Sequence, residues 1–141
     1  MIIAVDFDGT IVEHRYPAIG KEIPFAIRTL KQLQAEGHLL ILWSVRMGRL
    51  LDEAVAWCRE RDLEFYAVNK DYAEEKALEE GNRHFSRKIK ADVFIDDRNV
   101  GGLPDWGAIY QMITEKTSAQ EYYSGVAPEL LSEKKKPWWK F

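Results

Sequence analysis

Two pairs of aspartates follow apolar segments that lie far apart in the sequence. Asp6 and Asp8 follow the run IIAV, and Asp96 and Asp97 follow the run ADVFI. An apolar run without alternation is typical of a parallel strand that is covered on both faces. On their own, Asp6 and Asp8 would equally well end a strand and begin a turn at Gly9. Ligands bind at the carboxyl ends of strands in open parallel sheets, so the acids are also candidates for a site.

The chemistry open to such a cluster is that of a hard cation. Oxygen-only ligands with open coordination positions suit Mg²⁺ bound together with a substrate phosphate. An EF-hand calcium loop is excluded, because Ile11 and Pro17 occupy the positions that need a glycine and a glutamate. The sequence also contains no glycine-rich phosphate loop with a lysine and no dinucleotide-binding fingerprint. The acids therefore predict a magnesium site for a phosphorylated ligand.

The segments that must position these acids alternate between strand and helix. Hydrophobic periodicity and capping signals predict helices at 23–37, 49–62 and 104–115, and strands at 2–5, 38–44, 63–68 and 91–97. Pro24 is expected in the first turn of a helix that Gly37 ends. The charged segment 69–88 is expected to be partly helical and mostly solvated.

This alternation predicts an α/β protein: one three-layer, Rossmann-like domain with a parallel sheet and helices on both faces. The chemistry requires the two acid-tipped strands to be neighbours. The strand order must then be 3-2-1-4, which places a crevice between Asp6 and Asp96. The domain is expected to span 1–116, followed by an extension at 117–141.

Length and composition restrict the class of protein. A chain of 141 residues fits one domain that buries roughly two thirds of its unfolded surface. Cys58 is the single cysteine, so no internal disulfide can form; it is expected in the core of a protein from a reducing setting. The absence of a leader or a long apolar stretch predicts a cytoplasmic protein without a membrane partner. A net charge of −3 gives no general attraction to nucleic acid.

Four short motifs make the chain similar to the haloacid dehalogenase superfamily of phosphohydrolases. DFDGT matches the first motif, Ser44 in ILWSVR the second, a lysine in SRKIK the third and IDD the fourth. The resemblance extends from Met1 to the RNVGG that follows Asp97, and each motif stands at a strand end or just ahead of the last strand. It implies a Mg²⁺-dependent phosphatase that hydrolyses a phosphomonoester through an aspartyl-phosphate intermediate.

The resemblance implies a role for each matching residue. Asp6 would attack phosphorus, and Asp8 would act first as general acid and then as base, with its main-chain carbonyl on the metal. Ser44 would donate its hydroxyl to a phosphoryl oxygen. The expected metal ligands are Asp6, Asp8, Asp96 and Asp97, and the expected phosphate- or substrate-binding residues are Gly9, Thr10, Ser44, Val45, Arg46 and Arg98.

The basic residues of the site leave alternatives open. Lys88 is preferred as the third-motif lysine, because it has more chain than Lys90 in which to reach the carboxyl edge; Lys70 ranks third. Arg46 could grip the substrate or be a solvated loop charge. Arg98 could contact the substrate or balance the charge of the metal-binding acids.

The spacing of the motifs leaves no room for a cap domain, so an open site is expected. By resemblance, open sites act on bulky phosphates or are closed by a neighbouring subunit, which makes a homo-oligomer one expectation. The expected partner is a phosphorylated small molecule. His14, in the loop after the first motif, could reach the mouth of the site, but it is expected to have no role.

Two other functions remain as alternatives. A nucleotide or polynucleotide-end phosphatase is suggested by the similarity of IDDR to deoxyribonucleotidases, although the net acidity argues against strong binding of nucleic acid. A non-catalytic protein could use the same cleft to sense a phosphorylated ligand. The intact acids, Asp8 above all, argue against that reading.

The tail SEKKKPWWKF differs in composition from the rest of the chain. Three lysines precede Trp138, Trp139 and Phe141. Leaving these rings in water would forfeit roughly 1.5–3 kcal/mol for each one that could be buried. The tail is therefore predicted to dock, on a neighbouring subunit in preference to its own body or a membrane.

Overall fold

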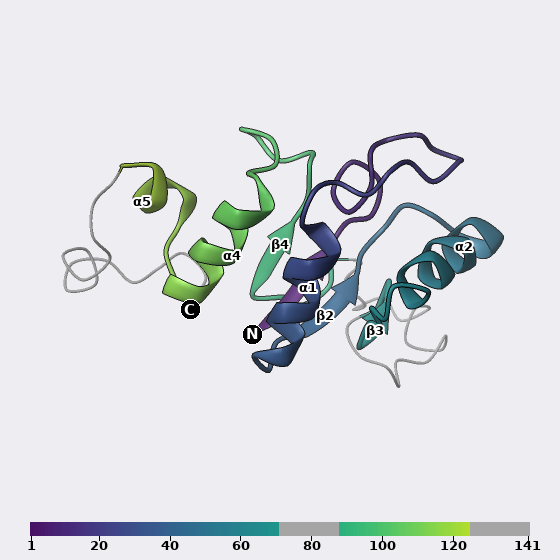
Figure 1. Ribbon diagram of the computed structural model, residues 1–141, viewed down its shortest axis with the longest axis horizontal. Coiled ribbons are helices and arrows are strands. Elements are labelled where there is room, and N and C mark those ends of the chain that lie inside the picture. The colour runs from purple at the N-terminus through teal and green to yellow at the C-terminus, as the bar shows by residue number, and fades with distance from the viewer. Residues whose placement is uncertain (71–87, 125–141) are drawn as a thin grey trace. The chain divides into compact units, whose positions relative to one another are not determined.

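The computed structural model describes residues 1–70 and 88–124 (Figure 1). The chain divides into two compact units, Met1–Leu103 and Pro104–Phe141, which are described separately. The first unit contains β1 (Ile2–Val5), α1 (Ala26–Ala35), β2 (Leu39–Leu42), α2 (Gly48–Arg59), β3 (Ala67–Val68) and β4 (Val93–Ile95). The second contains α4 (Trp106–Glu115) and α5 (Ala119–Ser124). The expected domain boundary at 116 stays a prediction.

The strands of the first unit form one parallel sheet in the order β3-β2-β1-β4. In the register of this sheet, Val5 lies beside Leu42 on one side and beside Ile95 on the other. Strands β1, β2 and β4 therefore end at the same edge. The predicted α/β class and the strand order 3-2-1-4 are confirmed, and the acid-tipped strands are neighbours.

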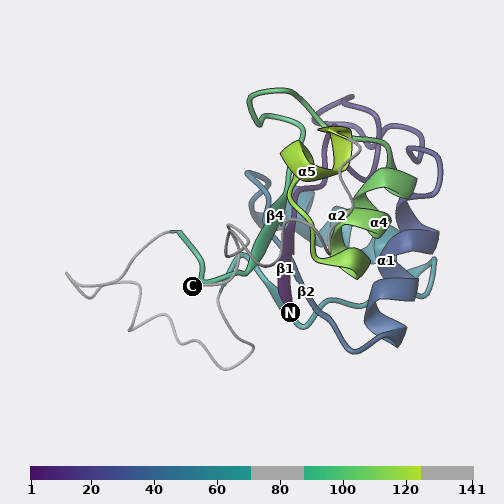
Figure 2. The same ribbon diagram turned by 90° about the vertical axis from the view of Figure 1, so that its left-hand side faces the viewer.

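Both faces of the sheet are apolar, as the unalternated strand sequences predict. Right-handed crossovers put α1 and α2 on the same face, and the two views show both helices on one side of the strands (Figures 1 and 2). On the other face, Ala4, Ile41 and Ala67 form a buried cluster with Ile89. The charged segment 69–88, expected to be partly helical and mostly solvated, falls mainly outside the described residues.

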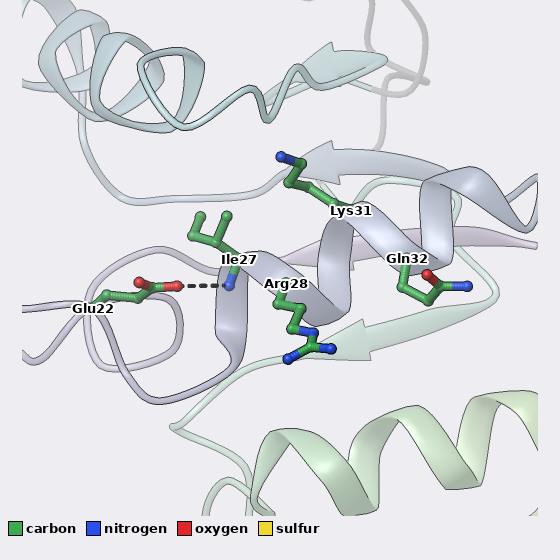
Figure 3. A pocket seen from close by; sticks show the side chains of 5 residues that line it. All are labelled: Glu22, Ile27, Arg28, Lys31 and Gln32. Atoms are coloured by element: carbon green, nitrogen blue, oxygen red, sulfur yellow. Dashed lines mark hydrogen bonds between the residues drawn. The ribbon is translucent and has the colours of Figure 1, made fainter.

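Helix α1 begins later than its sequence predicts. Pro24 lies ahead of the helix instead of in its first turn, and Phe25 takes a left-handed conformation with φ of 70° at the N-cap. The carboxylate of Glu22 accepts the main-chain N–H of Ile27 at 3.1 Å and satisfies one donor of the first turn (Figure 3). Gly37 follows the helix with φ of 93°, which confirms its predicted capping role.

The remaining elements bear on two further predictions. Cys58 is fully buried in α2, which confirms its packing role, and burial raises the pKa of its thiol to about 12.

Between β1 and β2 the described chain forms a loop and α1, so no cap domain is inserted there. The second possible place for a cap, between β2 and β4, includes residues outside the described part. The tail prediction also lies outside it.

None of the helices in the described residues is long and apolar enough to cross a membrane.

Candidate functional site

Three aspartates meet where β1 and β4 end. One carboxylate oxygen from each of Asp6, Asp96 and Asp97 lies within 4.8 Å of the others, and all three residues are half-buried. The sheet register brings them together, because Asp6 follows Val5 and Asp96 follows its neighbour Ile95. A hydrogen bond of 3.0 Å from the Asp6 main-chain N–H to the Ile95 carbonyl extends the pairing. The predicted meeting of the two acidic strand ends is confirmed.

Thr10 holds two of these acids in place. Its hydroxyl oxygen lies 3.4 Å from a carboxylate oxygen of Asp6 and 3.4 Å from one of Asp97, and it accepts the Asp97 N–H at 3.1 Å. The Thr10 side chain is fully buried. It is therefore placed to position the carboxylates, whereas the sequence predicted contact with phosphate or substrate.

Gly9 makes room for the carboxylate of Asp97. Its φ is +82°, a conformation that L side chains rarely adopt, and a Cβ atom at this position would collide with the Asp97 side chain. An added Cβ at this position would therefore force the Asp97 side chain to move.

We predict that Gly9→Ala lowers the free energy of unfolding by about 2 kcal/mol or more, because it combines backbone strain with this collision. Gly101→Ala is the matched control: its φ is +95°, but nothing lies within 4 Å of the added Cβ. Urea denaturation of both variants separates the two effects. Equal losses would show that the contact with Asp97 contributes nothing.

Burial is the largest cause that raises the pKa of Asp6 to about 7, and the neighbouring Asp97 and Asp96 carboxylates add to it. Three acids this close repel one another unless a cation neutralises them. Carboxylate oxygens without nitrogen or sulfur ligands are the donor set of a hard metal. The residues present therefore fit Mg²⁺.

The side chain of Asp8 takes part in a different interaction. Both of its carboxylate oxygens accept hydrogen bonds from Arg46, at 2.7 Å from Nε and 2.8 Å from Nη2. Arg46 is fully buried and Asp8 is 7% exposed, so the ion pair is shielded from water. The Asp8 carboxylate is not part of the three-acid cluster, and the expected contact of its main-chain carbonyl with the metal stays a prediction.

Arg46 also uses its remaining donors inside the protein. Nη1 donates to the main-chain carbonyls of Pro17 and Leu50 at 3.2 and 3.3 Å, and Nη2 donates to that of Ala18 at 2.9 Å. A guanidinium has five N–H donors, so none is left for a substrate anion in this conformation. The predicted substrate contact of Arg46 is thus not what the structure describes. A buried carboxylate is stable only when it is paired with a cation. Arg46 is therefore buried because it pairs with Asp8.

Ser44 is fixed by a residue that sequence reasoning missed. Asn69, directly after β3, accepts the Ser44 N–H at 2.8 Å through Oδ1, and its Nδ2 lies 3.4 Å from the Arg46 carbonyl. The Ser44 hydroxyl accepts the Arg46 N–H at 3.1 Å. A polar residue at the carboxyl end of the third strand was the available signal for Asn69.

A cavity of about 500 Å³ opens beside the acids. It is lined by Asp6, Asp8, His14, Tyr16, Trp43, Ser44, Val45, Asp96 and Arg98. The predicted residues Ser44, Val45 and Arg98 are therefore brought to the same cavity as Asp6. His14, for which no role was expected, also lines it, as do Tyr16 and Trp43, which the sequence did not single out.

The structure does not bring the candidate lysines into this cavity. Neither Lys88 nor Lys90 is among its lining residues. The Lys88 ammonium lies 5.3 Å from the centre of the Phe94 ring. Lys70 lines a separate cavity between α2 and β3. The identity of the third-motif lysine stays a prediction.

Comparisons with known proteins give one informative match. No protein-family model matches the chain, and no curated protein matches it. A solved structure of a conserved protein coded by a locus from Bacteroides thetaiotaomicron is 69% identical in sequence. The match covers 87% of this chain and 97% of that chain, with a TM-score of 0.80. At this identity and coverage the two chains share one family and one fold.

Proposed function

We propose that this chain, which belongs to the same family as the conserved Bacteroides thetaiotaomicron protein, is a Mg²⁺-dependent phosphomonoester hydrolase of the haloacid dehalogenase type. The observation that carries the proposal is the cluster of Asp6, Asp96 and Asp97 where adjacent strands end, two members of which, Asp6 and Asp96, line a cavity. The order of the four sequence motifs supports it independently.

Asp6 is the proposed nucleophile. One of its carboxylate oxygens forms a bond to phosphorus while the bond from phosphorus to the ester oxygen breaks, and the ester oxygen takes a proton from Asp8 and leaves as the alcohol. Water then attacks phosphorus, releases inorganic phosphate and regenerates the Asp6 carboxylate. Asp6, Asp96 and Asp97 would hold Mg²⁺, which when bound neutralises the charge between carboxylate and phosphate.

Ser44 and Asp8 have the supporting roles. The Ser44 hydroxyl can donate to a phosphoryl oxygen, because the bond that it makes to the Arg46 N–H uses it as an acceptor. Asp8 lines the same cavity, and its carboxylate is proposed to accept a proton from the attacking water. Asp8 would have to release Arg46 and carry a proton before it could protonate the leaving oxygen.

Phosphate release from a panel of phosphomonoesters tests this function directly. We expect turnover with Mg²⁺ and none after chelation with EDTA. The substrate is proposed to be a small phosphorylated molecule. A cytoplasmic location and a homo-oligomer stay predictions.

A non-catalytic phospho-ligand sensor is the second candidate, and the locked Asp8–Arg46 pair favours it. A protein in which Asp8 cannot leave Arg46 would bind a phosphorylated ligand beside the acids without turning it over. Calorimetric binding of phosphate monoesters without any release of phosphate would support this candidate over the hydrolase.

The free energy of unfolding should depend on pH and on bound Mg²⁺. Because the pKa of Asp6 is about 7 in the folded protein and near 3.8 in the unfolded chain, the folded state binds more protons between these values. The stability of the metal-free protein should therefore fall as pH rises from about 4 to 7. Mg²⁺ should raise Tm at pH 7.5 by several degrees, in line with linkage to a ligand that binds the folded state.

Asp6→Asn should remove both the loss of stability between about pH 4 and 7 and the increase in Tm on addition of Mg²⁺. We expect metal-free Asp6→Asn to be about 1–2 kcal/mol more stable than wild type at pH 7, less than full linkage implies, because water reaches the half-buried carboxylate. Asp52→Asn, an exposed change on α2, serves as the control. An unchanged Mg²⁺ shift in Asp6→Asn, measured by differential scanning calorimetry, would place the metal elsewhere.

A further inference from the structure

The cavity beside the acids has aromatic side chains in its lining. Tyr16, Trp43 and His14 contribute rings to this lining, which also contains carboxylates. Tyr16 is 47% exposed and the neighbouring Val45 is 73% exposed. Exposed apolar groups next to a polar site are typical of a surface that binds the organic part of a ligand.

Contacts with Arg46 hold Tyr16 and the loop around it in place. The buried guanidinium of Arg46 lies 5.3 Å from the centre of the Tyr16 ring. The same guanidinium binds the carbonyls of Pro17 and Ala18, the two residues that follow Tyr16. Because Arg46 is itself fixed by Asp8, the loop that carries Tyr16 is tied to the proposed catalytic carboxylate. A ring that is ordered before binding loses less conformational freedom when a ligand arrives.

Trp43 is a second aromatic residue of the cavity lining whose position is fixed by the fold. It follows β2 directly, its main-chain N–H donates to the Val5 carbonyl at 2.8 Å, and its half-buried side chain packs against the Ala4 and Ile41 cluster. The part of Trp43 that lines the cavity is therefore anchored in the sheet. Two anchored rings favour a planar partner, since stacked or edge-to-face rings attract beyond the area that they bury.

We propose that the site selects phosphomonoesters of alcohols that carry a planar aromatic or heteroaromatic ring, and that Tyr16 is the residue that selects the ring. This proposal rests on the proposed function, because it places the phosphate beside Asp6 and the ring against Tyr16. A cavity of about 500 Å³ lies within the range that holds a ligand of drug size.

The test compares benzyl phosphate with cyclohexylmethyl phosphate. Both are monoesters of primary alcohols with a six-membered ring one carbon from the ester oxygen, and they differ in the planarity of the ring. In wild type with Mg²⁺ we expect KM for benzyl phosphate to be lower by about five-fold, the range that aromatic contacts give. Tyr16→Ala should remove this preference and Tyr16→Phe should keep it. Tyr66→Ala, an exposed tyrosine on the β3 side of the sheet, should leave it unchanged.

Two outcomes would overturn the proposal. Equal KM values for the two esters in wild type would show that the ring is not recognised. A Tyr16→Ala effect that is the same for both esters would show that Tyr16 supports the site without selecting the ring. In either case hydrolysis itself would leave the proposed function intact.

Binding measurements keep the proposal testable if no ester is hydrolysed. Calorimetry with benzylphosphonate and cyclohexylmethylphosphonate, in the presence of Mg²⁺, needs no turnover. Tighter binding of the benzyl compound, lost in Tyr16→Ala and kept in Tyr16→Phe, would support ring selection while the hydrolase proposal fails. Equal binding of both compounds would overturn ring selection.

Discussion

Replacement of Asp6 by asparagine is expected to reduce turnover of p-nitrophenyl phosphate by at least about a thousand-fold, as removal of a covalent nucleophile does. An amide oxygen cannot form the acyl phosphate through which the reaction is proposed to pass. The protein should still fold, because the change removes a carboxylate whose pKa burial and two neighbouring acids raise to about 7. Asp8→Asn should cost less on this substrate, since nitrophenolate leaves without a proton.

The matched control for Asp6→Asn is Asp52→Asn, which removes an exposed carboxylate from α2. Circular dichroism should show the same secondary structure for wild type, Asp6→Asn and Asp52→Asn. Hydrolysis at the wild-type rate by Asp6→Asn would rule out the covalent mechanism, whereas loss of activity in Asp52→Asn would point to a fault in the preparation.

Replacement of Arg46 by methionine is expected to lower the free energy of unfolding by about 3–5 kcal/mol. The change leaves the Asp8 carboxylate buried without its cation. It also removes the donors that satisfy three main-chain carbonyls, those of Pro17, Ala18 and Leu50. Urea denaturation at neutral pH measures the loss.

Arg49→Met is the control, because Arg49 pairs with Glu53 on the surface of α2, where the two side chains are 86% and 48% exposed. Its cost should stay below about 0.5 kcal/mol. The double variant Asp8→Asn/Arg46→Met should recover part of the loss, since no charge is then left unpaired. A loss in Arg46→Met no larger than that in Arg49→Met would mean that the buried pair contributes little.

Sequence patterns predicted the sheet because each strand carries its own signal. The runs before Asp6 and Asp96 are apolar without alternation, which indicates burial on both faces, and the need for their acids to meet then determined the strand order. Helix ends were predicted less well. Pro24 suggested a first turn, but the left-handed Phe25 and the carboxylate of Glu22 begin the helix later.

The place of Asp8 could not be predicted from strand periodicity. In an extended strand Asp6 and Asp8 would point to the same face, but β1 ends at Val5 and the chain turns after Phe7, whose carbonyl accepts the N–H of Ile11 at 2.9 Å. The direction of the Asp8 side chain therefore depends on this turn. Its partner, Arg46, lies 38 positions away and is recognisable only once the two loops are folded.

Other members of the site lacked a sequence signal of their own. Tyr16 and Trp43 are residue types that pack into cores more often than they line cavities, and no short spacing links them to the acids. Lys88 was chosen for its distance along the chain from the fourth strand. The Lys88 ammonium lies 5.3 Å from the centre of the Phe94 ring, and the identity of the third-motif lysine stays a prediction.

The proposed intermediate can be trapped at a single residue. Wild-type protein mixed with Mg²⁺ and p-nitrophenyl phosphate, quenched in acid and reduced with borohydride, should contain homoserine in place of an aspartate, because borohydride reduces an acyl phosphate to an alcohol. Peptide mass spectrometry should locate homoserine at Asp6 and nowhere else, and only when substrate and Mg²⁺ are both present. Phosphate release without modification at Asp6, or with modification at Asp8, Asp96 or Asp97 instead, would contradict the assignment of Asp6 as the nucleophile.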